Sequence, residues 1–66
     1  MQIVLNGSPR DCAPGTTLAQ LLDDAGFAGK RVAVEINLDI VPRSQHVTHA
    51  LADGDRVEIV HAMGGG

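Results

Sequence analysis

The chain has 66 residues, which fits one small domain that buries roughly 60% of its unfolded surface. Its 5 Lys and Arg against 8 Asp and Glu give a net charge of −3, and it lacks the basic stripe that binding to nucleic-acid phosphates requires. A single Cys excludes an internal disulfide framework, and no apolar run approaches the ~20 residues of a membrane-spanning helix.

The first thirteen residues have the pattern of a β-hairpin. Residues 1–6 alternate as a strand, with Met1, Ile3 and Leu5 on one side. Asn6-Gly7 predicts a tight turn because both residue types accept positive φ. Since Pro9 cannot donate to a ladder, we place it in the turn or at its edge, and the second strand at Arg10 to Ala13.

The next segment predicts a short helix. Thr17 and Gln20 match a capping box, with Thr17 as the N-cap. Gly26 is suited to the left-handed position that ends a helix, and we expect Phe27 to fold back onto the last turn. The apolar residues between these signals have the spacing of one helical face: Leu18, Leu21, Leu22 and Ala25.

The second half predicts strands at 32–37, 40–41 and 56–62. Turns are expected at 37–39 and 53–55, and the ambiguous segment 43–51 is expected to contain a helical turn around 44–46. In the last strand, Val57 and Ile59 point to one side together with His61. Glu58, Val60 and Ala62 point to the other.

This order of elements predicts an α+β fold of the β-grasp, or ubiquitin-like, class. We expect a mixed sheet of four to five strands with one main helix packed across one face. The first and last strands can pair in parallel, because everything between them serves as the crossover. We expect residues 1–62 to form the domain and residues 63–66 to form a flexible C-terminal glycine tail.

The three terminal glycines carry the chemistry that the sequence indicates, although a frayed, inert tail is the simplest alternative. Without Cβ atoms, Gly64, Gly65 and Gly66 can enter a narrow channel. An extended arm of four residues reaches on the order of 13 Å at ~3.3 Å per residue. The Gly66 carboxylate needs activation, most simply by ATP as an acyl-adenylate, before it can accept sulfur. The chain itself would need no catalytic residues.

Two blocks carry a resemblance to a known family. They are Val34 to Gln45, VEINLDIVPRSQ, and Asp53 to Gly66, DGDRVEIVHAMGGG. Together with the terminal Gly-Gly, the small size and the expected β-grasp order, they resemble the ubiquitin-like sulfur carriers. Within that group the chain is similar to the ThiS family of thiamine biosynthesis. It ends in three glycines where the shared minimum is two.

The resemblance implies a sequence of reactions on the tail. A ThiF-like, E1-like enzyme would adenylate Gly66 with ATP. Sulfur from cysteine, delivered through a desulfurase and its persulfide, would convert the adenylate into a thiocarboxylate. The tail, with Gly64 and Gly65 supplying thinness, would then donate sulfur in a ThiG-like thiazole synthase. The chain would be a co-substrate that binds no cofactor, and we expect it to dock through the sheet face and rim near the last strand.

Other candidate residues have simpler interpretations. Cys12 is expected to be a small apolar strand residue, because nothing nearby would activate its thiol. His46 and His49 lack the second cluster that a tetrahedral metal site needs, and His61 is expected to be a strand residue with a satisfied ring. We therefore predict no metal site. The remaining polar candidates indicate a solvated helix face and a turn: Asp23, Asp24, Asp53 and Asp55.

Three alternatives remain open at this point. The small subunit of molybdopterin synthase has the same fold, tail and activation chemistry. A ubiquitin-like protein modifier would join its C-terminus to lysines of target proteins. A β-grasp interaction domain would have an inert tail.

The start of the chain lacks a basic region followed by a long apolar core, so with one unpaired Cys we expect a cytoplasmic protein that binds neither membrane nor nucleic acid.

Overall fold

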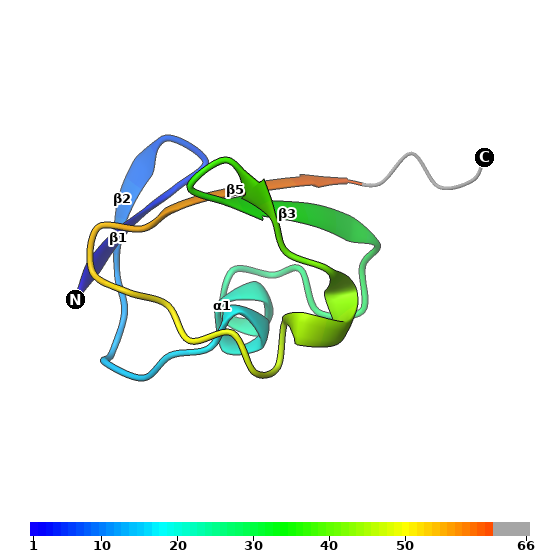
Figure 1. Ribbon diagram of the computed structural model, residues 1–66, viewed down its shortest axis with the longest axis horizontal. Helices are drawn as coiled ribbons and strands as arrows, with labels where there is room; N and C mark the ends of the chain where they lie inside the picture. The colour runs from blue at the N-terminus through cyan, green and yellow to red at the C-terminus, as the bar shows by residue number, and fades with distance from the viewer. Residues whose placement is uncertain (62–66) are drawn as a thin grey trace.

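The structure is a computed structural model that describes residues 1–61. Within these residues, one mixed sheet has the strand order β2-β1-β5-β3-β4. β1 and β5 pair in parallel, and the other neighbours are antiparallel. α1 (Leu18–Asp24) and the 3-10 helix η1 (Arg43–Gln45) lie on the same side of this sheet (Figure 1). The strands are β1 (Gln2–Leu5), β2 (Ser8–Asp11), β3 (Val32–Ile36), β4 (Asp39–Ile40) and β5 (Arg56–His61). The predicted β-grasp fold is confirmed.

The first hairpin closes through a two-residue turn. Asn6 and Gly7 have φ values of 47° and 85°, and Leu5 pairs with Ser8. The prediction that the second strand begins at Arg10 is wrong, because β2 begins at Ser8 and includes Pro9. β2 is an edge strand, and Pro9 lies opposite Val4 in a pair that does not exchange ladder hydrogen bonds. The missing N–H of Pro9 therefore costs the sheet nothing.

Helix α1 begins and ends as predicted. The Thr17 hydroxyl accepts from the Gln20 N–H at 3.3 Å, and the Gln20 side-chain oxygen accepts from the Thr17 N–H at 2.9 Å. Gly26 takes φ 89° after the helix, and the Phe27 N–H donates to the Leu22 carbonyl at 2.8 Å. This pairing is the Schellman motif, which satisfies carbonyls of the last turn. Phe27 is thereby fixed close to the helix, as expected.

The second hairpin also turns on two residues in the left-handed region, Asn37 at φ 52° and Leu38 at φ 73°. The predicted strand at 40–41 is shifted by one residue, since β4 comprises Asp39–Ile40. A two-residue turn pairs Ile36 with Asp39, and Val41 then leaves the strand to become buried. The predicted helical turn around 44–46 is present as η1, one residue earlier.

The core lies between the sheet and α1. Its members come from β1, α1, β3, the segments on either side of η1, and β5. They are Ile3, Leu18, Leu21, Leu22, Val34, Ile36, Val41, Leu51, Val57 and Ile59. The predicted inward sides of the first and last strands are therefore confirmed. The opposite side of β5 faces away from the helix, and this leaves one face of the sheet uncovered by any described element.

Candidate functional site

β5 is the strand that leads to the C-terminal glycines. It lies between β1 and β3: its first residues, Arg56 and Val57, pair with β1, and residues 57–61 pair with β3. Its register with β3 runs from Val57 opposite Ile36 to His61 opposite Val32. In Figure 1, β5 runs away from the end of the molecule that holds the N-terminus. Pairing with β3 therefore holds β5 as far as His61, the last described residue before the glycines.

The predicted site residues Gly64, Gly65 and Gly66 lie outside the described residues. The same holds for Ala62, predicted as the last strand residue, and for the predicted boundary between residues 62 and 63. These assignments stay predictions. The structure describes the chain as far as His61, at the end of β5.

Side-chain hydrogen bonds hold the beginning and middle of β5. The Asp55 carboxylate is buried, and it accepts from the Asn37 side-chain amide at 3.0 Å and from the Ala52 N–H at 2.8 Å. The Asn6 side chain accepts from the Ile59 N–H at 2.8 Å. The Asn37 side-chain oxygen also accepts from the Arg56 N–H at 3.0 Å. Both asparagines belong to hairpin turns, so each turn is joined to β5. The sequence pattern identified these residues only as turn formers.

An aromatic contact lies at the end of β5. The rings of His61 and Phe27 have centroids 5.9 Å apart and planes inclined at 52°. Phe27 is half-buried and packs against the core, whereas His61 is exposed. The prediction that His61 is a strand residue is confirmed, and its ring has an aromatic neighbour. This contact ties the last described residue to the loop that follows α1.

A hollow of about 210 Å³ lies beside this contact, between α1, the loop after it and η1. Phe27 and Val32 line it together with Lys30, Arg43 and His46. His46 is buried, and its Nε2 lies 3.1 Å from the Val41 carbonyl oxygen, so this side chain has a structural partner. Among residues 1–61, no group of three His, Cys, Asp or Glu side chains is arranged to hold a metal ion.

Cys12 is not within a strand, which corrects the prediction by one residue. It follows β2 directly, since β2 ends at Asp11. Its side chain is half-buried and packs against the core, as a small apolar residue does. Its carbonyl accepts from the N-terminal ammonium of Met1 at 2.8 Å. These contacts give Cys12 a structural role.

The aspartates also have the structural roles that were expected. Asp53 accepts from the Gln2 N–H at 2.8 Å, and Asp55 holds the turn as described above. Asp23 and Asp24 are exposed at the end of α1. None of the four therefore requires a ligand to explain its position.

The uncovered face of the sheet is the part of the site that sequence reasoning did not resolve by residue. Among the described residues, the exposed large apolar side chains are Leu38, Ile40, Val47 and Val60. Three of them lie on β5 or on the β3–β4 hairpin. The sequence contained a signal for this exposed apolar surface, because Val60 is an apolar residue at an outward position of the alternating last strand.

Among the described residues, no helix is long and apolar enough to cross a membrane.

A mixed sheet with parallel first and last strands, and one main helix across one face, defines a ubiquitin-like protein of the β-grasp class. The sequence model described as the ThiS family matches residues 3–66, nearly the whole chain. The chain belongs to the ThiS family.

Individual relatives agree with this assignment. The sulfur carrier protein ThiS of Escherichia coli is 36% identical over 66 residues, which cover all of both chains. The crystal structure of the thiamine biosynthesis protein ThiS from Geobacter metallireducens superposes with a TM-score of 0.86. It is 32% identical in sequence, again over all of both chains.

Two longer relatives are thiazole synthases. The protein of Paramagnetospirillum magneticum is 44% identical and that of Magnetococcus marinus is 46% identical. Each match covers all of this chain and 20% of the relative. The chain thus spans about a fifth of the length of these two proteins, and each contains a region that is similar to the chain as a whole.

Proposed function

We propose that the chain is a sulfur carrier in thiamine biosynthesis, which partner enzymes act on as a co-substrate. Membership of the ThiS family over nearly the whole chain is the observation that carries this proposal. The fold supports it, because a central strand fixed at His61 leads to Gly64, Gly65 and Gly66. Partner enzymes would recognise the folded domain, and the glycine segment would extend into their active sites.

In this proposal, the Gly66 carboxylate is the reacting group. A ThiF-like, E1-like enzyme binds ATP and transfers AMP to a carboxylate oxygen, with release of pyrophosphate. A sulfur nucleophile then attacks the carbonyl carbon, and the C–O bond to AMP breaks. Where the nucleophile is the persulfide of a cysteine desulfurase relay, a thiol must then reduce the S–S bond to leave the thiocarboxylate. The chain binds no cofactor in these steps.

The second partner is a ThiG-like thiazole synthase. The thiocarboxylate at Gly66 would enter its active site and donate sulfur to the forming thiazole. Gly64 and Gly65 fit this role, because a backbone without Cβ atoms can pass close to channel walls. The two thiazole synthases that contain a region similar to this chain support the choice of partner. The lone Cys12 supports a cytoplasmic setting.

The test of this function is sulfur transfer to purified acceptors. The chain, an E1-like enzyme, ATP, a desulfurase and cysteine are combined with a thiazole synthase and its substrates, and thiazole phosphate is measured. A parallel reaction contains the large subunit of molybdopterin synthase. We expect product only with thiazole synthase. Product only with the molybdopterin enzyme would assign the carrier to that pathway.

A chain that lacks Gly65 and Gly66 is the matched control. We expect it to give no thiazole and to melt at the same temperature as the full chain, because exposed termini make few contacts. Undiminished thiazole formation by this chain would exclude the tail as the carrier. Adducts with target lysines that resist reducing agents and require Gly66 would instead indicate a protein modifier.

A further inference from the structure

The sheet face turned away from α1 carries an exposed apolar surface near the end of β5. We call it the outer patch and define it by Ala33, Ile40 and Val60. Ile40 is 75% exposed and Val60 is 60% exposed. Ala33 lies directly opposite Val60 in the pairing of β3 with β5. All three residues line one hollow of about 120 Å³, so they form a continuous surface.

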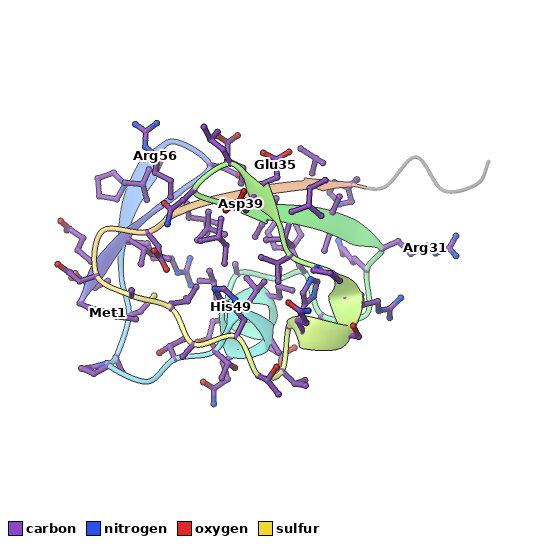
Figure 2. The ribbon with its side chains drawn as sticks, viewed as in Figure 1. Met1, Arg31, Glu35, Asp39, His49 and Arg56 are labelled. Atoms are coloured by element: carbon purple, nitrogen blue, oxygen red, sulfur yellow. The ribbon has the colours of Figure 1, made fainter. Side chains whose placement is uncertain are left out.

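Two carboxylates lie within the same hollow. Glu35 on β3 and Glu58 on β5 are directly opposite each other, and both are exposed. Like charges in this position destabilise a sheet. Arg56 precedes Glu58 by two residues, and Figure 2 shows it on the same side of the sheet as Glu35 but toward the other end of β5. A second cation, contributed by a partner protein at this hollow, would reduce the repulsion between the Glu35 and Glu58 carboxylates.

The hairpin that carries Ile40 has a second unfavourable feature. Leu38 at its tip has φ 73° and is 80% exposed. Glycine or asparagine fits this turn position without strain, whereas a leucine side chain does not. Backbone strain of this kind gathers at surfaces that have a function. The β3–β4 hairpin and the neighbouring strand β5 therefore carry two features that lower the stability of the isolated domain. One is an exposed leucine, and the other is a pair of opposed carboxylates.

We propose that the outer patch docks onto thiazole synthase, on an apolar area of that enzyme that also presents an arginine or lysine. This inference rests on the function proposed above. The cation would lie between Glu35 and Glu58, and contacts of Ile40 and Val60 on either side would exclude water from the ion pair. The two carboxylates favour a partner surface that carries a cation, and the two thiazole synthases with a region similar to this chain are the basis for choosing this enzyme.

The position of the patch fits this role. Val60 immediately precedes His61, the last described residue before the glycines. An enzyme docked on the patch would therefore stand beside the point from which the glycine segment continues. Docking of the body and entry of the tail would then involve the same enzyme surface.

The test compares two double variants by calorimetric titration into purified thiazole synthase. Glu35→Gln with Glu58→Gln removes the carboxylates of the patch. Asp23→Asn with Asp24→Asn removes two exposed carboxylates near the end of α1, where acidic groups oppose the helix dipole. Each pair of substitutions raises the net charge by two, from −3 to −1. Neither pair is expected to lower the melting temperature, so both variants stay folded.

We expect the Glu35/Glu58 variant to bind thiazole synthase about tenfold more weakly than the wild-type chain, and the Asp23/Asp24 variant to bind within about twofold. A matched apolar pair is Ile40→Ser against Val47→Ser. Val47 is 69% exposed but lines the hollow beside α1. Only the Ile40 substitution should weaken binding, again by about tenfold.

Wild-type binding by the Glu35/Glu58 and Ile40 variants would overturn the docking inference and leave the proposed function intact. If the wild-type chain does not bind thiazole synthase at all, the proposed partner and the docking inference are both overturned. Weakened binding to the adenylating enzyme alone would also overturn the inference, because it would assign the patch to that enzyme.

Discussion

Phe27 and His61 form a ring contact, at 5.9 Å between centroids, that joins the loop after α1 to the end of β5. Phe27 is held by its N–H bond to the Leu22 carbonyl and by packing against the core. His61 is the last described residue before the glycine segment. The helix therefore supports the strand from which that segment continues.

Replacement of Phe27 by alanine should lower the free energy of unfolding by about 2 kcal/mol, because a half-buried aromatic side chain is lost from the edge of the core. Urea denaturation measures this change. Phe27→Leu is the control, since it retains most of the apolar area and should cost about half as much. An alanine variant as stable as the wild type would show that the contact carries no packing energy.

Leu38→Gly should stabilise the isolated domain by about 0.5–1 kcal/mol. The turn holds Leu38 at φ 73°, which glycine adopts without strain, and part of the gain is lost to the greater freedom of glycine in the unfolded chain. Leu38→Asn is a second variant that tolerates this conformation and should not destabilise. Thermal unfolding is the measurement, and a lower melting temperature for both variants would contradict the assigned backbone strain.

Asp55→Asn should destabilise the domain by about 1–3 kcal/mol, because an amide cannot accept on both of its polar atoms. The two Asp55 oxygens accept from Asn37 and from the Ala52 N–H in a buried setting. Asp53→Asn is matched to it, since exposed Asp53 accepts through one oxygen only. Equal unfolding energies for the two variants would mean that burial of Asp55 has no energetic consequence.

Gly65→Val should abolish sulfur delivery to thiazole synthase and leave the melting temperature unchanged. A β-branched side chain at this position would collide with the walls of a narrow channel. Thiazole formation under single-turnover conditions measures the effect, and Gly65→Ala is expected to lose less. Normal turnover by the valine variant would argue against a narrow channel.

The sequence was sufficient for the elements whose signals are local. Thr17 and Gln20 make a reciprocal capping box, and Gly26 ends the helix in the left-handed conformation. The order of the elements was enough to predict the parallel pairing of β1 with β5, because everything between these two strands serves as the crossover.

Strand boundaries depended on register, which the local pattern does not contain. Pro9 can lie within β2 because its pair with Val4 needs no N–H. Whether this pair exchanges hydrogen bonds is set by the two-residue turn that precedes β2. The opposition of Glu35 and Glu58 likewise follows from the alignment of β3 with β5. Alternation places each glutamate on the outward side of its strand, but only the register shows that the two carboxylates face each other.

In the proposed function, Gly66 carries the sulfur. The most direct test of this role is the intact mass of the chain after incubation with ATP, an E1-like enzyme, a cysteine desulfurase and cysteine. We predict a mass gain that corresponds to one oxygen replaced by sulfur, located at Gly66 by fragmentation. An unchanged mass, with partner enzymes shown to be active on another carrier, would contradict it and leave the chain as an interaction domain with an inert tail.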